Sequence, residues 1–347
     1  MPINESNNQV LPISLRMIAR RAGVSLGTVS NVLNHPELVS PAKREVVLKV
    51  LKEANLGDAS AKANRPKAAL KSLGIMIPTL TNPFYVDLSN GFQEAASLAG
   101  YGAVICSMDE NREMQGFYAS LLLEQKIEGV LVSPIEQWDK YLYKFAARGI
   151  PVVLHGPKQS NLDMCSISGN HFHGGELGVQ HLYDLGHRSI VWVTLEDRFP
   201  QIIEREAGVV AAAERLGITL KMICVSKINA AQGEAAVERI LKLDSEPTAI
   251  FCANDYTAVG VICGLSARGI KTPEEMSVLG YDGISSLSNA ILPLSTISQP
   301  VEQLGRDFAK ILIEEIESSG THEHKNLLFE PELIARATTS QPRLYAV

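Results

Sequence analysis

The sequence predicts a small all-α helix-turn-helix domain followed by a larger α/β domain with doubly wound parallel sheets. Between residues 14 and 51, three short amphipathic patterns are separated by helix caps and a glycine turn. From Leu73 onward, short apolar runs alternate with longer amphipathic segments, as expected of parallel strands covered by helices on both faces. Charge is distributed unevenly between the two ends of the chain. Residues 1–72 hold 11 Lys and Arg against 5 Asp and Glu, whereas the whole chain has a net charge of −6.

Bulk composition limits the class of protein. A chain of 347 residues is expected to form more than one domain, and 46% hydrophobic with 20% charged residues is ordinary for a soluble globular protein. No apolar run is long enough to span a membrane, and the polar N-terminus does not resemble a secretory signal. The five cysteines are scattered without a CxxC pair, which indicates buried free thiols in a reducing compartment. We therefore expect a cytoplasmic protein with no membrane partner.

The first predicted helices are short and closely joined. Ser14 can cap a helix beginning at Leu15, and Gly23 provides the permissive backbone for a sharp stop. Ser25 then caps a second helix, whose apolar stripe consists of Val29, Val32 and Leu33. Ser40 followed by Pro41 begins a third helix, for which we expect a buried stripe of Val46, Val47, Val50 and Leu51.

Such a pair of helices points to DNA. In a helix-turn-helix, residues at the start of the second helix meet base edges in the major groove. The candidates are Ser25, Leu26, Gly27, Thr28, Ser30 and Asn31. Three basic residues on the first helix can contact phosphates, namely Arg16, Arg20 and Arg21. A helical module that binds another protein is the alternative interpretation. The excess of Lys and Arg over Asp and Glu in residues 1–72 favours double-stranded DNA as the partner.

The segment 58–72 reads as a hinge or linker, which gives an N-terminal domain of residues 1–57 and a body of residues 73–347. It is small, basic and weakly patterned, and Lys62 is a further candidate phosphate contact. In the body, eight strand-like runs begin with "LGIMIP" and end with "MSVLGYD". Helical segments between them are expected at 85–99, 111–126, 172–186, 204–216, 231–243 and 257–268. No G-x-G-x-x-G or Walker loop follows a strand, so we expect neither a nucleotide cofactor nor an enzyme.

The N-terminal motif carries a family resemblance. "IARRAGVSLGTVSNVLNHPELVS" resembles the signature of the lac-repressor (LacI/GalR) family of bacterial transcription regulators. The body is similar too, at "NPFYVDLSNGFQEAASLAGY", "HLYDLGHRSI", "CANDYTAVG", "VLGYDG" and "STISQPVEQLG". The resemblance implies a two-lobed, type I periplasmic-binding-protein-like fold with the ligand between the lobes. One lobe would comprise about 73–168 and 297–325, and the other about 169–296 and 326–347.

The family's hinge helix carries an A-R-x-L core whose leucines wedge into the minor groove. The corresponding residues here are Ala61, Lys62, Ala63 and Asn64, without the arginine and the leucine. The sequence therefore predicts weaker DNA bending than is typical of the family.

Effector contacts are expected at strand ends and in one family motif. Arg205, in "REAG", is similar to the family's cleft arginine, and Asp282, in "GYD", to the aspartate facing it. Sugar-like ligands need polar groups that bind neighbouring hydroxyls and an apolar face for the ring. The other candidates are Asn254, Phe84, Tyr85 and Gln299. For Phe84 an ordinary core position, and for Asp282 a turn-forming role, are the alternatives.

The remaining polar residues support no catalytic or metal site. His171 and His173, and likewise His322 and His324, have H-x-H spacing, but no companion ligand stands at a metal-binding interval, so loop or helix-cap positions are expected.

The sequence thus predicts a non-enzymatic transcriptional regulator, acting as a repressor. Its homodimer would bind a pseudo-palindromic operator under the control of a small-molecule effector, a sugar or related metabolite. The alternative is a solute-binding protein of the same fold without a regulatory role.

Overall fold

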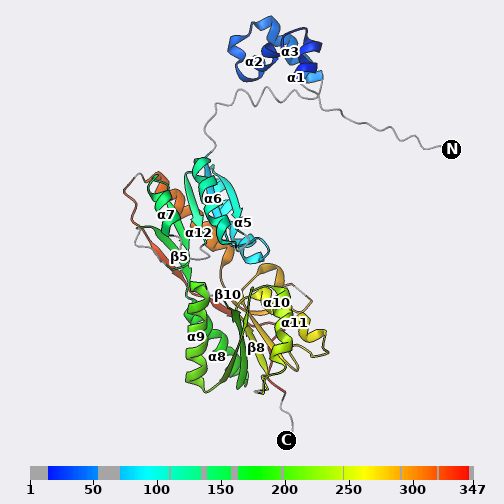
Figure 1. Cartoon of the computed structure of the whole chain (residues 1–347), viewed down its shortest axis with the longest axis vertical. Helices are drawn as coiled ribbons and strands as arrows, with labels where there is room; N and C mark the ends of the chain where they lie inside the picture. Colours follow the sequence, from blue (N-terminus) through cyan, green and yellow to red (C-terminus); the bar gives the residue numbers. More distant parts are fainter. Residues whose placement is uncertain are drawn as a thin grey trace, which may run out of the picture. The chain divides into compact units, whose positions relative to one another are not determined.

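The computed structural model describes residues 15–53, 71–108, 111–133, 139–157, 163–196, 199–244, 246–289, 291–318 and 320–343. The chain forms two compact units, Met1–Leu70 and Lys71–Val347. The second unit is built from two lobes, each with its own sheet (Figure 1). Within the described residues, no helix combines the length and the apolar character needed to cross a membrane.

The first unit contains a helix-turn-helix. It consists of α1 (Leu15–Ala22), α2 (Leu26–Asn34), a 3-10 turn (Pro36–Leu38) and α3 (Pro41–Glu53). Gly23 has a φ of 64° in the turn after α1, and the Ser25 side chain caps α2 by accepting a hydrogen bond from the Thr28 amide at 3.1 Å. The buried core joins all three helices through Ile18, Ala19, Ala22, Val29, Val32, Val47 and Leu51.

One expectation for this core is wrong. Val46, which we expected in the buried stripe of the third helix, is 46% exposed. Only one face of a short helix can reach a core this small, so Val47 and Leu51, four residues apart, fill the contact. The Ser14 cap and the whole segment 58–70, including Lys62 and the hinge residues 61–64, lie outside the described residues.

The first lobe has a six-stranded parallel sheet in the order β11-β5-β4-β3-β1-β2. Its strands are β1 (Ser72–Ile77), β2 (Gly102–Ser107), β3 (Gly129–Val132), β4 (Val152–His155), β5 (Cys165–Gly169) and β11 (Asn326–Phe329). Its helices are α5 (Pro83–Leu98), α6 (Arg112–Glu124), α7 (Asp139–Ala146) and α12 (Val301–Glu317).

The second lobe repeats this plan with the strand order β12-β10-β9-β8-β6-β7. All pairs are parallel except β10 with β12. The strands are β6 (Ser189–Leu195), β7 (Thr219–Val225), β8 (Ala249–Cys252), β9 (Ser277–Asp282), β10 (Ser295–Ser298) and β12 (Glu332–Ile334). The helices are α8 (His171–Asp184), α9 (Pro200–Leu216), α10 (Ala230–Ile240), α11 (Asp255–Ser266) and a short 3-10 helix (Ser285–Leu287).

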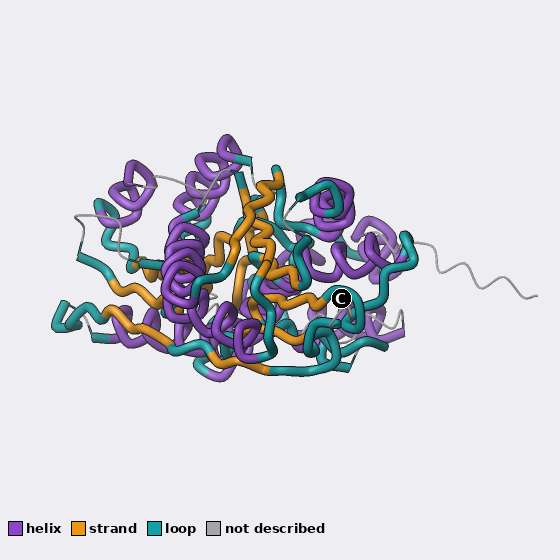
Figure 2. The backbone as a smooth tube through the Cα atoms, turned by 90° about the horizontal axis from the view of Figure 1, so that it is seen from below, coloured by secondary structure: helices purple, strands orange, loops and turns teal. Residues whose placement is uncertain are grey.

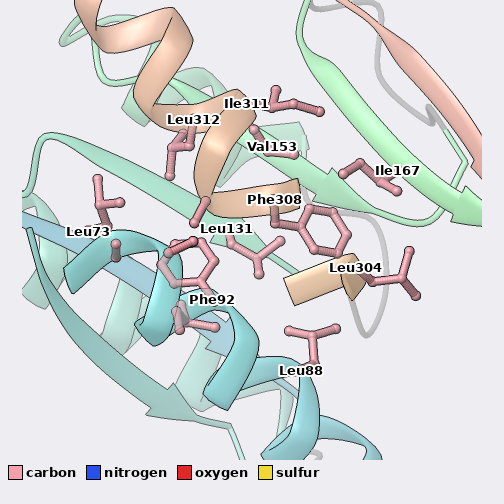
Figure 3. Close-up of a cluster of buried hydrophobic side chains, with 14 of the residues drawn as sticks. Leu73, Leu88, Phe92, Leu131, Val153, Ile167, Leu304, Phe308, Ile311 and Leu312 are labelled. Atoms are coloured by element: carbon pink, nitrogen blue, oxygen red, sulfur yellow. The ribbon is translucent and has the colours of Figure 1, made fainter. Parts of the chain in front are cut away.

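Helices cover both faces of each sheet, which confirms the predicted fold class. Figure 2 shows strands with helices on either side of them. In the first lobe, α5 and α12 bury one face and α6 and α7 the other; in the second lobe, α8 and α9 oppose α10 and α11. Figure 3 shows the first of these cores, where Phe92 of α5 and Phe308 of α12 meet strand residues such as Leu131. Burial of such aromatic and branched side chains is the main force that holds the layers together.

The chain crosses between the lobes three times, after Gly169, after Ser298 and after Phe329. Because β11 pairs with β5, residues 326–329 belong to the first lobe, so the last crossing comes a few residues later than the sequence suggested. The first and third crossings touch each other, since the backbone amide of Asn170 donates to the Phe329 carbonyl at 2.7 Å.

Helix pairs approach closely because glycines face each other where they cross. Between α8 and α9, a Cβ at Gly208 would overlap the Phe172 carbonyl oxygen, and one at Gly175 would overlap that of Arg205. The pairs α5–α12 and α10–α11 cross in the same way, through Gly91 and Gly305 and through Gly233 and Gly260. The α8–α9 crossing matters for function, because the two helices carry His171 and Arg205.

Candidate functional site

A cavity lies between the two lobes, where strands of both sheets end. Its empty space is about 520 Å³, counting the part open to solvent. This position is where doubly wound sheets bind ligands. The lining residues are Pro78, Asn82, Phe84, Tyr85, His155, His171, Phe199, Gln201, Ile202, Arg205, Ile228, Asn254, Asp282 and Gln299. All six effector candidates chosen from the sequence are among them.

Arg205 is the central cation of the cavity. It projects from α9, is 3% exposed, and its Nη2 lies 3.7 Å from Asp282 Oδ1. Its Nη1 donates to the Ala253 carbonyl, and its guanidinium lies 3.3 Å from the centre of the Tyr281 ring. These contacts hold the guanidinium in one orientation, so that a ligand meets a preorganised donor group.

Asp282 faces Arg205 from the end of β9. Its Oδ1 accepts a hydrogen bond from Gln299 Nε2 at 3.1 Å, and burial raises the pKa of this carboxyl although Arg205 acts against the rise. Its φ of 119° is unusual for a residue with a side chain. Such backbone conformations cost about 1–3 kcal/mol and concentrate at functional sites. The structure therefore brings together the two residues that the family resemblance indicated.

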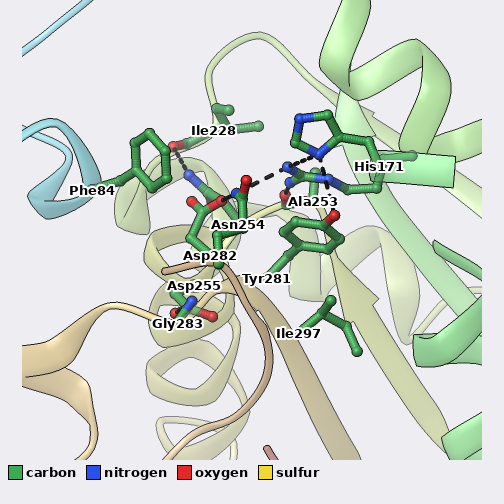
Figure 4. A network of polar contacts seen from close by, with 12 residues as sticks. Phe84, His171, Ile228, Ala253, Asn254, Asp255, Tyr281, Asp282, Gly283 and Ile297 are labelled. Carbon is green, nitrogen blue, oxygen red and sulfur yellow. Dashed lines mark hydrogen bonds and ion pairs between the residues drawn. The ribbon is translucent and has the colours of Figure 1, made fainter. Parts of the chain in front are cut away.

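Asp255 supports the site without lining it. Its carboxylate accepts hydrogen bonds from the amides of Gly283 and Ile284 at 2.9 and 2.8 Å and from the Thr296 hydroxyl at 2.6 Å. It thus fixes the backbone directly after Asp282. Figure 4 shows Asp255 beside Gly283, below Asp282. Asn254, and not Asp255, caps α11.

Asn254 lines the cavity, yet its polar atoms already have partners. Its Oδ1 accepts from the Thr257 amide at 2.8 Å, and its Nδ2 donates to the Ile228 carbonyl at 3.2 Å (Figure 4). One amide hydrogen is left for a ligand. Asn254 therefore contributes mainly by holding the segment that contains Ile228 against the start of α11.

Aromatic rings form the first-lobe wall. Phe84, at the start of α5, is 4% exposed and belongs both to the core and to the cavity lining. Tyr85 meets it edge to face at 5.1 Å, and His155 stacks on it at 5.7 Å. In Figure 4 the Phe84 ring lies on the side of the network occupied by Ile228. The two interpretations of Phe84 are thus compatible, because one edge of a core ring reaches the cavity.

Two buried histidines were missed by sequence reasoning as cavity residues. His155 ends β4, and its Nδ1 lies 3.0 Å from the Ser133 hydroxyl. His171 begins α8, with its Nδ1 3.3 Å from Arg205 Nη2 and 3.2 Å from the Tyr281 hydroxyl. Burial lowers the pKa of both, to about 4 for His155. A signal was present in each case, since His155 closes an apolar strand-like run and His171 comes two residues after the end of the next strand.

Three buried polar atoms around this cavity have no hydrogen-bond partner in the protein: His171 Nε2, Arg205 Nε and Gln299 Oε1. Unpaired buried polar groups are rare and costly, so their gathering at one cavity indicates a polar ligand. Asn170, which precedes His171, has partners for both ends of its side-chain amide. Its Oδ1 accepts from the His173 backbone amide and so caps α8, and its Nδ2 donates to Glu330 Oε1 at 3.0 Å, between the first and third crossings.

Acid should destabilise the body through His155. Because the pKa of His155 in the folded protein, about 4, is below the usual 6.5, the folded state binds fewer protons than the unfolded chain between these values. We expect the free energy of unfolding to fall by up to about 3 kcal/mol between pH 6.5 and 4. Denaturant unfolding across this range should show a smaller fall in His155→Gln; equal falls in both proteins would contradict the prediction.

On the first unit, the surface of α2 remains open. Leu26, Gly27 and Asn31 are exposed, and Thr28 and Ser30 are partly exposed. The side chains of Arg16, Arg20 and Arg21 on α1 are exposed as well. The residues of α2 that we expected to contact bases therefore lie on its outward face. Basic residues lie on the neighbouring helix, α1.

Comparisons with known proteins agree with both units. Residues 14–56 match the model of bacterial regulatory proteins of the lacI family, and residues 179–339 match a periplasmic binding protein-like domain. The HTH-type transcriptional repressor PurR of Vibrio atlanticus (strain LGP32) is 30% identical over 332 residues, which cover 94% of this chain and 98% of the relative. The chain belongs to the LacI family of bacterial regulatory proteins. It is accordingly a DNA-binding transcriptional regulator with an effector-binding body.

Solved structures place the body among LacI-family regulators. A regulator from Enterococcus faecium with bound ribose is 25% identical, with a TM-score of 0.73 over 79% of this chain and all of that one. The complex of the transcriptional regulator CelR with cellobiose is also 25% identical, with a TM-score of 0.68 over 94% of this chain and 99% of its own.

Proposed function

We propose that this LacI-family protein is a cytoplasmic, non-enzymatic repressor whose operator affinity changes when a small sugar binds between its lobes. One observation carries the proposal. The Arg205–Asp282 pair lies at the interlobe cavity together with three buried polar atoms that have no protein partner. The sugar-bound structures of related regulators support the same class of ligand.

The chemistry of the cavity suits neighbouring hydroxyl groups. Arg205 can donate and Asp282 can accept, so together they bind two adjacent hydroxyls, while Gln299 Oε1 can accept from a third. His171 is neutral because its pKa is lowered, so its ring can accept or donate one hydrogen bond without adding charge. Phe84 and Tyr85 supply an apolar wall for the ring face. A neutral, polyhydroxylated ligand matches this arrangement.

Movement of the lobes is how ligand binding in the cavity would change the operator affinity of the DNA-binding unit. Both lobes contribute lining residues, and the crossing at 298–301 contains Gln299, which lines the cavity itself. A ligand that contacts both lobes favours one interlobe arrangement in proportion to its differential affinity. A single helix-turn-helix buries little surface, so we propose a homodimer on a pseudo-palindromic operator, which places two such units on one site.

The test begins with selection of the operator from fragmented genomic DNA by the full-length protein. Fluorescence anisotropy then measures operator affinity with ribose, other monosaccharides and disaccharides, and with apolar molecules of similar size as the control. We expect salt-sensitive, sequence-specific binding that at least one sugar changes. Absence of specific binding would overturn the regulatory role, whereas specific binding unaffected by any sugar would overturn the effector class.

Asn31 is expected to read a base. It is exposed on α2 and can form paired hydrogen bonds with adenine in the major groove. Asn31→Ala should lower the preference for the operator over unrelated DNA by about tenfold, and leave binding to unrelated DNA nearly unchanged. Arg20→Ala is the matched control, because loss of a phosphate contact weakens binding to both DNAs alike. Equal weakening by Asn31→Ala would contradict base reading.

A further inference from the structure

Four potential metal ligands meet at the edge of the first lobe where its strands begin. Cys165 is the first residue of β5, Glu315 lies near the end of α12, and His322 and His324 lie in the segment leading to β11. One ligand atom from each of them lies within 4.8 Å of all the others. No other such group of His, Cys, Asp and Glu occurs in the described part of the chain. Cys165 is far in sequence from the other three residues, and the fold alone brings it to them.

The distances between the four donor atoms are close to those within the coordination shell of a metal ion. Cys165 Sγ lies 3.1 Å from His322 Nε2 and 3.8 Å from His324 Nδ1. Glu315 Oε2 lies 3.9 and 3.8 Å from the same two nitrogens. Donor atoms of a tetrahedral zinc ion with ordinary bond lengths are roughly 3.3–3.6 Å apart. Only small side-chain movements separate this arrangement from that geometry.

Burial makes the cluster unusual for an exposed edge. Cys165 is fully buried, the His322 side chain is 4% exposed, and that of Glu315 is 16% exposed. Glu315 Oε2 is buried without a hydrogen-bond partner. A buried carboxylate oxygen that makes no hydrogen bond is costly, and the two imidazoles 3.8 and 3.9 Å from it carry a charge only when protonated. A cation at the centre of the cluster would remove that cost.

The surroundings are also those of a metal site. The Lys325 amide donates to Cys165 Sγ at 3.3 Å, and Glu314 Oε1 lies 4.0 Å from His322 Nδ1. Lys325 Nζ in turn holds Glu314 at 2.8 Å. Such outer contacts orient ligands and adjust their basicity. A solvent-accessible cavity lined by Glu315, His322 and His324 gives an ion a path to the cluster.

We propose that Cys165, Glu315, His322 and His324 form a binding site for one Zn²⁺ ion per chain. A thiolate, two imidazoles and one carboxylate suit a borderline-soft tetrahedral ion, whereas Mg²⁺ and Ca²⁺ prefer shells of oxygen ligands. On binding, the Cys165 thiol proton passes to solvent and the sulfur becomes the ligand. His322 and His324 lie in a loop, as expected, but the His322 side chain is only 4% exposed and lies against Cys165.

The site ties three segments together and is separate from the effector cavity. It joins the start of β5, the end of α12 and the segment before β11, whereas the cavity lies at the opposite, carboxyl ends of the strands. We therefore expect zinc to stabilise the first lobe as a ligand that binds only the folded state. Effector contacts at Arg205 and Asp282 should not depend on the ion.

The test uses full-length protein that has been stripped with a chelator, dialysed and titrated with Zn²⁺ against a chromogenic competitor. We expect one tightly bound zinc per chain, a higher melting temperature, and a Co²⁺ spectrum with a thiolate charge-transfer band and tetrahedral d–d bands. Cys165→Ser and His324→Ala should each weaken zinc binding by at least about tenfold, and Cys165→Ser should remove the charge-transfer band.

The matched controls are Cys263→Ser and His173→Ala, which remove an exposed cysteine and a partly exposed histidine outside the cluster. Both should bind zinc like the unchanged protein, which would show that the ion is not held by accessible side chains elsewhere. Zinc affinity unchanged in Cys165→Ser, or no zinc binding by a folded protein that still binds its operator, would overturn the proposal. His324→Ala, at a partly exposed position, keeps the test valid if Cys165→Ser fails to fold.

Discussion

Arg205→Ala should weaken the effector response by about 100-fold or more. The change removes the donor that faces Asp282 and leaves that carboxylate buried without its cation. Loss of one partner of a buried pair costs several kcal/mol, so both sugar binding and the stability of the second lobe should fall. The sugar concentration needed for half of the full change in operator affinity measures the effect directly, while operator binding without sugar should persist.

Two further variants separate ligand contact from damage to the fold. Arg215→Ala, on an exposed position of the same helix, should retain the full response. The double variant Arg205→Ala with Asp282→Ala removes the unpaired charge, so it should regain stability relative to Arg205→Ala without regaining the response. A full effector response in the single variant, with normal operator binding, would show that the cavity has been assigned wrongly.

Gly208→Ala should lower the free energy of unfolding by about 3 kcal/mol. An added Cβ would overlap the Phe172 carbonyl oxygen, and neither α8 nor α9 can yield locally because the contact is with backbone. The helices must separate, which also shifts Arg205 and His171 relative to each other. We therefore expect a weaker sugar response together with the lower stability, measured by denaturant unfolding and operator anisotropy.

Ala207→Ser is the neighbouring control for this prediction. Ala207 is exposed on the same helix, so its substitution should change stability by no more than about 0.5 kcal/mol. If Gly208→Ala were as stable as Ala207→Ser, the close crossing of α8 and α9 would not be required for the fold.

Local sequence patterns were sufficient for most of the fold. The cap at Ser25, the turn at Gly23 and the apolar spacing of Val29 and Val32 act within a few residues, so the helix-turn-helix could be predicted in detail. Several strand-like runs of the body, such as those that form β3, β4, β8 and β9, are buried on both faces and are therefore continuous in sequence. Val46 shows the limit, because propensity and spacing do not decide which of two adjacent valines reaches a small core.

The candidate effector site was predictable only in part. Arg205 and Asp282 were chosen through the family resemblance, and the structure places them 3.7 Å apart. His171 was misjudged because a histidine after a strand can cap a helix or enter a cavity, and only the facing groups distinguish these positions. Asn254 shows the converse, since its polar atoms are largely used by neighbouring backbone.

By itself, the sequence determined the order of helices and strands, the division of charge and the helix that we expect to face DNA, because each depends on a short stretch of chain. Tertiary structure alone decided which side chains share a cavity and which form the proposed zinc site. Cys165 and His322 are 157 residues apart and come together because β5 and the segment before β11 lie side by side. Strand pairing across that separation depends on the packing of the whole lobe, which no local pattern contains.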